Sequence, residues 1–395
     1  MRDASLDMLP EPDSELVAQS KQLQQLITQE IQQHRGWIGF DHFMDLALYT
    51  PDLGYYSSAL KKFGEQGDFV TAPLLGDLFG RCIARQCAQV IVSIQNASLY
   101  EFGAGDGSLA VAVITELDKL GALPDCYYIM ETSARLRQRQ RSSLEDLSPE
   151  LKGRVKWLEN LPDVINGVVV GNELLDAMPC KRFEVNSHGQ IHELGVCISD
   201  ARFEWSISSQ PLLDVDWLAK RDLGSDYQSE LPMRAAAWVS TVGEKIDQGI
   251  VLLIDYGFPR QEFYHLDRNQ GTLMCHYRHY AHTDPFFWPG LQDITTHIDF
   301  TSIAEAGAIS GLRTLGFCDQ ANFLLSCGLT DILADSQTGG EPGTKEILKL
   351  SAEVKKLTMP HEMGELFKVI AMGKENPENL IGFQMRNQAR RLLPE

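Results

Sequence analysis

The sequence has little positive charge for its length. Its 395 residues include 35 Lys and Arg against 54 Asp and Glu, which gives a formal net charge of -19. Binding along a phosphate backbone depends on clustered Lys and Arg that displace counterions. The shortage of basic residues therefore argues against nucleic acid as substrate or partner. An acidic balance suits a cationic polypeptide, although many proteins are this acidic only for solubility.

Other absences narrow the class of protein further. The eight cysteines are scattered and form no Cys-X-X-Cys pair, so neither a zinc ribbon nor a disulfide scaffold is indicated. The amino-terminal residues before the first apolar run are rich in Asp and Glu, contrary to a secretory signal or an organelle transit peptide. No apolar run is long enough to span a bilayer. These features predict a cytoplasmic protein with reduced thiols and no membrane span.

What is present is a mixture of amphipathic helices and short apolar strands. Residues 14–34 and 75–94 have apolar side chains at helical spacing, and the stretch between them, 36–62, is aromatic and turn-rich. From residue 99 onward, short apolar strands alternate with helices, the pattern of βαβ units in a parallel sheet. Strands are predicted at 99–102, 126–130, 155–158, 167–171, 250–254 and 366–372, and helices are predicted to begin at Ser108 and Ser133.

The predicted α/β core is interrupted in sequence. Residues 183–208 alternate like an antiparallel hairpin pair, and a polar, less regular stretch follows as far as Pro232. We interpret both as an insertion, and we predict a helix over Phe300 to Leu315. The expected organisation is a helical extension at 1–97, the first half of the core at 98–182, the insertion at 183–245 and the second half of the core at 246–395.

The segment that carries most information is the glycine-rich turn after the strand at 99–102, which reads Gly103-Ala104-Gly105-Asp106-Gly107. Glycines let a backbone turn tightly at a strand end and approach a ligand without a Cβ in the way. A dinucleotide fingerprint has the spacing GxGxxG, whereas this turn has GxGxG, and Asp106 would repel a phosphate. S-adenosylmethionine has no phosphate and carries an ammonium and a sulfonium, which suit Asp106 and Glu101.

Polar side chains follow two more of the predicted strands. Glu131 comes after the second strand, where a carboxylate can accept both ribose hydroxyls of an adenosine; a Glu favoured by a helix dipole is the alternative. Asn172, Glu173 and Asp176 follow the strand at 167–171. Carboxylates three positions apart lie on one helical face or in one tight turn. Glu173 and Asp176 could thus align an amine or guanidinium nucleophile, with a capping network as the alternative.

Together these motifs resemble those of the MidA family, class I methyltransferases that include a mitochondrial relative active on a protein arginine. The resemblance covers nearly the whole chain. It implies an α/β fold, a Rossmann-like class I methyltransferase sheet with an N-terminal helical extension and an inserted β-rich, irregular subdomain. It also implies S-adenosyl-L-methionine as cofactor. The motifs lie at 67–73, 101–108, 171–179, 254–257, 271–273 and 293–300.

The activity that the resemblance implies is methylation of a protein substrate at arginine. A small-molecule methyltransferase and a cofactor-binding assembly or scaffold protein without turnover stay open as alternatives. Expected partners are a protein substrate, by resemblance a respiratory complex I subunit, and a second copy of the chain in a homodimer; the expected location is a bacterial cytoplasm. The expected catalytic residues are Glu173, Asp176 and His297, and the expected cofactor residues are Gly67, Asp68, Thr71, Glu101, Gly103, Gly105, Asp106, Glu131, Asn172 and Glu173.

Three histidines, His276, His279 and His282, have a spacing that could suggest a metal site. On a helix each step of three residues falls about 60° short of a full turn, so the outer two side chains diverge. No carboxylate nearby would orient the imidazoles either. We therefore expect no metal there, and we interpret 260–300 as an aromatic substrate loop that closes over a side chain.

His297 and Asp293 lie in a polar stretch after that aromatic loop. We expect this stretch to face the acceptor pocket rather than the adenosine. For His297, a buried histidine with a purely structural role is the alternative.

Overall fold

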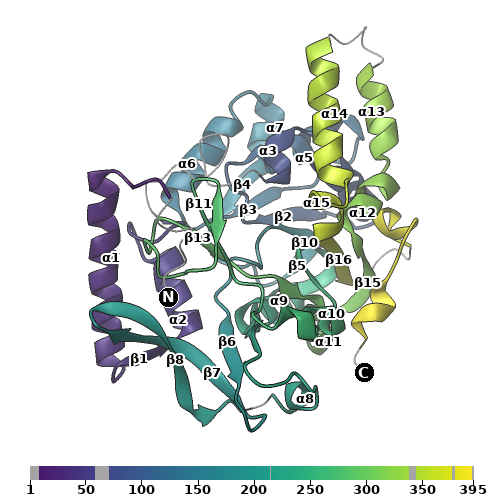
Figure 1. Cartoon of the computed structure of the whole chain (residues 1–395). Helices are drawn as coiled ribbons and strands as arrows, with labels where there is room; N and C mark the ends of the chain where they lie inside the picture. Colours follow the sequence, from purple (N-terminus) through teal and green to yellow (C-terminus); the bar gives the residue numbers. More distant parts are fainter. Residues whose placement is uncertain (1–8, 58–70, 214, 338–343, 376–378, 394–395) are drawn as a thin grey trace. The chain divides into compact units, whose positions relative to one another are not determined.

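The computed structural model describes residues 9–57, 71–213, 215–337, 344–375 and 379–393 (Figure 1). The chain divides into two compact units, each assembled from three separate stretches of sequence. Unit 1 comprises Met1–Phe69, Asp176–Ala235 and Phe258–Asp299, and unit 2 comprises Val70–Leu175, Ala236–Gly257 and Phe300–Glu395.

Unit 2 contains an open, mostly parallel sheet whose strands follow the order β15-β16-β10-β5-β2-β3-β4. From β10 to β4 all neighbours are parallel, whereas β16 runs antiparallel to both β10 and β15. The chain passes from β2 outward to β3 and β4 and then returns to β5 on the other side of β2. The strand order thus reverses at β2 and β5, where ligands of such sheets bind. The strands are β2 (Ser98–Phe102), β3 (Tyr127–Met130), β4 (Val155–Leu158), β5 (Ile165–Asn172), β10 (Ile246–Phe258), β15 (Arg313–Asp319) and β16 (Phe367–Lys374).

Helices bury both faces of this sheet. Successive strand residues point to opposite faces, and Val168 and Val170 belong to one core cluster together with apolar residues of α4 and α5, while Val169 is equally buried on the other face. Burial on both faces explains the continuous apolar runs in β5 and β10. The helices are α3 (Ala72–Leu75), α4 (Leu78–Ile91), α5 (Ser108–Lys119), α6 (Ala134–Ser143), α7 (Pro149–Arg154), α11 (Phe300–Ile309), α12 (Gln320–Ser326), α13 (Leu329–Gln337), α14 (Thr344–Thr358) and α15 (Met363–Leu366), and α9 (Met233–Lys245) begins in unit 1 and ends in unit 2.

Unit 1 combines two long helices with small antiparallel sheets. One sheet has the order β1-β7-β6-β9 with β8 on β7, and another has the order β12-β11-β13. Apolar residues at helical spacing, among them Leu23, Ile27 and Ile31, form a core with Phe40 and Phe43. The elements are α1 (Ser14–Gln33), β1 (Trp37–Gly39), α2 (Phe40–Tyr49), β6 (Lys181–Val185), β7 (Ile191–Ser199), β8 (Arg202–Pro211), α8 (Asp216–Ala219), β9 (Gln228–Leu231), α10 (Arg260–Phe263), β11 (Met274–Tyr277), β12 (Tyr280–His282), β13 (Asp293–Thr295) and β14 (Ile298–Asp299).

The structure confirms the predicted α/β class and the parallel core strands, but it corrects two elements. The predicted helix from Phe300 to Leu315 ends at Ile309, because Gly311 takes a left-handed φ of +85° and the chain enters β15. The aromatic stretch 36–62 contains the helix α2, whose aromatic and aliphatic side chains are buried at helical spacing. The four-part division of the sequence stays a prediction. In the described ranges no helix is long and apolar enough to cross a membrane.

Candidate functional site

The glycine-rich turn lies at the carboxyl end of β2, at the switch in strand order. Gly103, Gly105 and Gly107 have φ angles of +69°, +52° and +91°, in the left-handed region that costs other L-residues energy. At Gly107 a Cβ would also lie 3.1 Å from the Cα of Gln140. Asp106 accepts a hydrogen bond on Oδ1 from the backbone N–H of Ser108 at 3.0 Å, which orients its carboxylate over the first turn of α5.

The buried side chain of Gln140 connects this turn to the ends of the two neighbouring strands. Gln140 lies on α6 and is 0% exposed. Its Nε2 donates to the carbonyl oxygen of Gly105 at 3.1 Å and to Oε2 of Glu131 at 3.2 Å, and its Oε1 accepts from the indole Nε1 of Trp157 at 2.8 Å. One amide therefore connects the residues that follow β2 and β3 to a tryptophan within β4.

Glu131 follows β3 and has both carboxylate oxygens in this network. Oε1 accepts from the backbone N–H of Ser133 at 2.8 Å, while Oε2 accepts from Gln140. Burial raises the pKa of Glu131, and these hydrogen bonds to the carboxylate oppose the rise. Each carboxylate oxygen can accept a second hydrogen bond, so Glu131 keeps the capacity to bind hydroxyl groups such as those of a ribose.

Glu101 occupies a different environment from the other acidic residues of the site. It is 1% exposed, and its Oε2 accepts a hydrogen bond of 2.7 Å from the hydroxyl of Tyr127 on β3. Burial raises the pKa of Glu101 to about 7, although the Tyr127 hydrogen bond works in the opposite direction and Asp106 adds to the rise. The carboxylate is thus a buried group below the turn, and a contact with cofactor stays a prediction for it.

The segment after β5 is a turn rather than a helix, and it is fixed from the neighbouring strand. Glu173 has a φ of +48°, which is uncommon for a residue with a side chain and is concentrated at functional sites. Oδ2 of Asp255, on β10, accepts from the backbone N–H groups of Leu174 and Leu175 at 3.1 and 2.8 Å. Asn172 donates from Nδ2 to Oε1 of Glu173 at 3.1 Å. These bonds hold the Glu173 side chain at the carboxyl end of the sheet.

Among the predicted cofactor residues, Gly67 and Asp68 lie outside the described residues. Thr71 precedes α3 as its N-terminal capping position, with an extended φ of -84°. The side chains that bond to the turn are those of Asp106 itself, of Gln140 and of Ser143, whose hydroxyl donates to the carbonyl oxygen of Asp106 at 2.7 Å; none of these three is a Lys or Arg. These groups bring no positive charge to the turn, which fits a cationic cofactor, while the glycine at position 107 lets the turn pack closely against Gln140.

In unit 1, Asp176 and Asp293 belong to a cluster with two tyrosines. The backbone N–H of Thr296 donates to the carbonyl oxygen of Asp176 at 3.0 Å, and the hydroxyl of Tyr56 contacts both carboxylate oxygens of Asp293 at 2.9 and 3.0 Å. Tyr49 stacks on Tyr56 with ring centroids 5.5 Å apart. Burial raises the pKa of Tyr49 well above its usual range, and the charges of Asp293 and Asp176 add to the rise.

His297 lies in the same unit and is half-buried. Its backbone N–H donates to Oγ1 of Thr272 at 3.0 Å, and its ring centroid is 5.4 Å from that of Phe258. Thr272 in turn donates from Oγ1 to Glu230 at 3.0 Å. The motif at 271–273 therefore positions the backbone of His297, whose assignment as a catalytic residue stays a prediction.

The run of histidines lies in a β-hairpin, so the expectation that these residues are on a helix was wrong. His276 is on β11 and His282 on β12, and Arg278 and His279 form the two-residue turn with φ angles of +47° and +67°. Within the aromatic loop, Phe286 packs against the rings of Phe43, Phe203 and Trp205. That ring contributes to the core of unit 1.

Gln140 and Tyr127 could not be assigned to the cofactor region from the sequence, and Asp255 was identified only as part of the family motif at 254–257. Gln140 sits among polar residues of α6, and nothing in its neighbours distinguishes it from a solvent-exposed position. Asp255 offered a signal, because a carboxylate directly after a five-residue apolar run needs a buried partner. In the sequence, Tyr127 cannot be distinguished from the other apolar residues of its predicted strand.

Comparison with known proteins agrees with this geometry. Residues 82–318 match a family model described as "Putative S-adenosyl-L-methionine-dependent methyltransferase". A crystal structure from Burkholderia thailandensis, described as a "likely methyl transferase" bound to S-adenosyl-homocysteine, is 42% identical, covers 97% of this chain and 99% of its own, and has a TM-score of 0.90. The native crystal structure from the same organism has a TM-score of 0.89.

Curated relatives are more distant. The mitochondrial protein arginine methyltransferase NDUFAF7 of Danio rerio is 25% identical over 366 residues, which cover 85% of this chain and 83% of the relative. The Homo sapiens protein of the same name is 25% identical over 393 residues, which cover 91% and 85%. The family match and the structure with bound S-adenosyl-homocysteine establish S-adenosyl-L-methionine as the cofactor.

Replacing Gly105 by Val is expected to abolish cofactor binding, because the side chain would stand in the turn that approaches the cofactor. In wild-type protein, cofactor at 100 times Kd stabilises the fold by about 2.7 kcal/mol. The measurement is a thermal shift with and without S-adenosyl-L-methionine. Gly121→Val is the matched control: Gly121 has a similar φ of +64° with nothing within 4 Å of a Cβ, so it should lose stability but keep the shift. A normal shift in Gly105→Val would contradict this placement.

Replacing Gln140 by Leu should weaken cofactor binding by at least about tenfold, which is 1.4 kcal/mol. Leucine has a similar size but leaves the Gly105 carbonyl and the Trp157 indole without the bonds that position the turn. The measurement is the Kd by titration calorimetry. Gln138→Leu, at an exposed position of the same helix, should bind normally. Equal affinities in the two variants would show that the amide does not support the cofactor turn.

The stability of the cofactor-free protein should depend on the charge of Glu101. Its pKa is about 7 when folded and near 4.5 when unfolded, so the folded state holds the extra proton. This contribution to stability is complete below pH 4.5 and is lost as the pH rises through 7. The free energy of unfolding of wild type should therefore fall between pH 5 and pH 8 by on the order of 2–3 kcal/mol more than that of Glu101→Gln, whose amide does not titrate. Urea unfolding at both pH values measures this, and parallel pH profiles would refute it.

Proposed function

Since the chain belongs to this family of S-adenosyl-L-methionine-dependent methyltransferases, we propose that it transfers the methyl group to an arginine side chain of a protein. Two facts support the proposal. The curated relatives at 25% identity are named protein arginine methyltransferases. The observation that carries it is the cluster of Tyr49, Tyr56, Asp293 and Asp176 in unit 1.

That cluster has the chemistry of a guanidinium-binding site. Aromatic faces attract cations through the ring quadrupole, and guanidinium groups stack on such rings more readily than ammonium groups do. Carboxylates accept the N–H groups of a guanidinium, often in pairs. The pKa of Tyr49 is raised in part by the negative charges of Asp293 and Asp176, so both carboxylates act electrostatically on the same tyrosine. A flat, cationic acceptor suits this combination better than an anionic one.

The reaction requires alignment and removal of one proton. The guanidinium nitrogen attacks the methyl carbon, the S–C bond breaks as the C–N bond forms, and the sulfonium becomes the neutral thioether of S-adenosyl-homocysteine. The attacking nitrogen loses a proton, which passes to a carboxylate and then to solvent. Arginine has a pKa above 12, so the site must draw its positive charge away from the attacking nitrogen. We assign this role to Glu173 and Asp176, and a supporting role in the acceptor site to His297.

The narrower expectations stay predictions. They are a respiratory complex I subunit as substrate, a homodimer and a bacterial cytoplasmic location. The acidic balance of the chain, with a formal net charge of -19, favours a cationic polypeptide over nucleic acid as the acceptor.

The test incubates the purified enzyme with methyl-labelled cofactor and a lysate of cells that lack the gene. We expect label in a protein band and, after digestion, on methylarginine. The double variant Glu173→Gln, Asp176→Asn should lose transfer, since both side chains keep their size and only their charge is removed. The single variant Asp176→Asn, which keeps the expected cofactor residue Glu173, should also retain the thermal shift with cofactor. A matched control is Asp222→Asn, Asp226→Asn, two exposed carboxylates of unit 1 that should leave transfer unchanged.

Each outcome of this experiment discriminates between functions. Label in a small-molecule fraction would favour a small-molecule methyltransferase, and tight cofactor binding with no label anywhere would favour an assembly or scaffold protein. Label on lysine would keep protein methylation but exclude arginine. If the double variant transferred methyl groups at the wild-type rate, the proposed activity would still hold, but Glu173 and Asp176 would not be its catalytic residues.

A further inference from the structure

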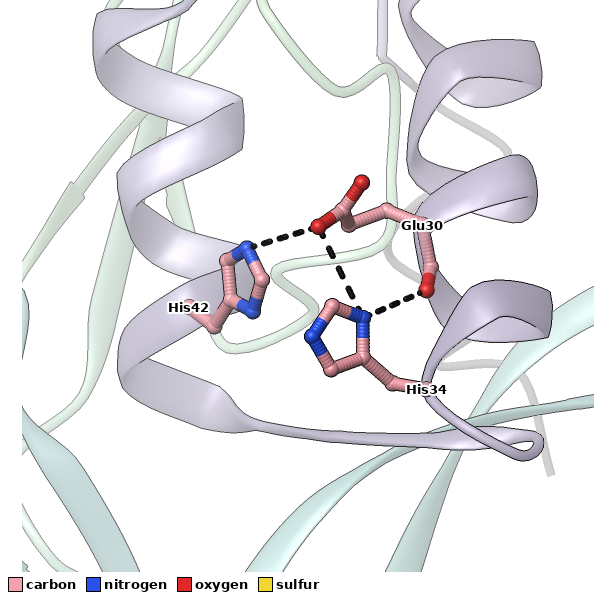
Figure 2. A group of neighbouring side chains, drawn as sticks. All are labelled: Glu30, His34 and His42. Atoms are coloured by element: carbon pink, nitrogen blue, oxygen red, sulfur yellow. Dashed lines mark hydrogen bonds and ion pairs between the residues drawn. The ribbon is translucent and has the colours of Figure 1, made fainter.

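Two histidines and a glutamate converge on the surface of unit 1. Glu30 and His34 lie one turn apart at the end of α1, and His42 lies in the first turn of α2 (Figure 2). One ligand atom from each lies within 4.8 Å of those of the other two, and in the described part of the chain no other group of three such residues does so. The side chains are 28%, 50% and 36% exposed, so an ion from solvent can reach them.

The ion-pair distances in this group are close to those between two ligands of one metal ion. Oε1 of Glu30 is 3.6 Å from Nδ1 of His34 and 3.6 Å from Nε2 of His42. Hydrogen bonds between nitrogen and oxygen are shorter, about 2.7–3.2 Å. Ligands that each lie about 2.0–2.1 Å from a tetrahedral zinc ion are roughly 3.4 Å from one another. Both distances from Glu30 to the histidines are close to this value, and the ligand atoms of His34 and His42 lie within 4.8 Å of each other.

The backbone that carries the group is held by the core beneath it. Ile27 and Ile31 of α1 and Phe40 and Phe43 of α2 are fully buried and belong to one cluster. Only the short strand β1 and its flanking residues connect the two helices. The three ligands thus come from a helix–strand–helix segment of 13 residues, 30–42, whose ends are fixed by packing. Such a segment loses little conformational freedom when it binds an ion.

We propose that Glu30, His34 and His42 form a binding site for a divalent transition metal ion. Two imidazoles and one carboxylate favour Zn²⁺, Ni²⁺, Cu²⁺ or Co²⁺ over Mg²⁺ and Ca²⁺, which prefer oxygen ligands. Three protein ligands leave a position for water or a fourth group. The bound ion links α1 to α2. This inference concerns unit 1 alone and does not depend on the proposed methyl transfer.

Metal binding has one local cost. His34 also donates from Nδ1 to the backbone carbonyl oxygen of Glu30 at 2.9 Å. Coordination through Nδ1 replaces that hydrogen bond, because the lone pair that binds a metal occupies the position of the donated proton. The imidazole then binds as its other tautomer, with the ring proton moved from Nδ1 to Nε2. The His34 side chain is 50% exposed, and its ring meets the His42 ring edge-on with centroids 5.3 Å apart.

The test uses the full-length chain without a histidine tag, treated with chelator and then exchanged into metal-free buffer. Titration calorimetry with Zn²⁺ should give one equivalent bound, and Co²⁺ should give the visible absorption of a site with nitrogen and oxygen ligands. His34→Ala, His42→Ala and Glu30→Gln should each weaken Zn²⁺ binding by at least about tenfold. The Zn²⁺-induced rise in the Tm of the chain should disappear in the same variants.

Controls separate this site from other sources of binding. His188→Ala removes an exposed histidine elsewhere in unit 1 and should bind Zn²⁺ like wild type. Cys197 is the half-exposed thiol of the chain, and Cys197→Ser should also bind normally; a thiolate absorption band with Co²⁺ would instead assign the binding to cysteine. Circular dichroism confirms that each variant is folded. Absence of Zn²⁺ binding in wild type, or equal affinity in the folded His42→Ala and Glu30→Gln variants, would overturn the proposal.

Discussion

The cofactor region depends on one buried amide. The glycine-rich turn has a left-handed backbone that no regular hydrogen-bond ladder stabilises, because the ladders that pair β2, β3 and β4 end at Phe102, Met130 and Leu158. Gln140 donates to Gly105 and Glu131 and accepts from Trp157, so a single fully buried side chain satisfies polar groups from all three. A buried polar group without a partner is costly. The network is therefore stable only when the turn, the carboxylate and the indole are in place together.

A second constraint acts on the other side of the switch in strand order. Asp255 is a buried carboxylate that directly follows an apolar run in β10 and pairs in register with Lys368 of β16, and its Oδ2 accepts from the backbone N–H groups of Leu174 and Leu175. These bonds tie the chain after β5 to β10 and hold Glu173 in its left-handed conformation. The two sides differ in kind. A side-chain amide fixes the turn after β2, whereas a carboxylate fixes the backbone after β5. Each of them places acidic groups at the carboxyl ends of these strands.

Unit 1 contains a buried ion pair that positions the backbone of its polar residues. Arg182 and Glu230 form a buried ion pair at 3.2 Å, and Glu230 also accepts from the backbone N–H of Thr272 at 2.9 Å. Breaking such a pair from one side is strongly destabilising, because a buried charge remains. The pair fixes the motif at 271–273, from which the backbone of His297 is held. Buried polar contacts thus position the candidate functional residues of this unit, while α1 and α2 contribute to its apolar core.

The sequence by itself determined the class of fold and the class of cofactor. A strand buried on both faces is apolar along most of its length, and a turn with three left-handed residues strongly favours glycine, so both features are visible as local patterns. The strands around Phe102 and Val169 and the turn Gly103 to Gly107 could be predicted for that reason. The helix α2 and the strand β15 could not be predicted. A short amphipathic segment is compatible with both the helical and the strand period of apolar residues, and its packing determines which of the two forms. Only the tertiary structure brought Gln140, Glu131 and Trp157 together, and Glu30 and His34 with His42, because a side-chain contact depends on where distant helices pack and leaves no periodic trace in the chain.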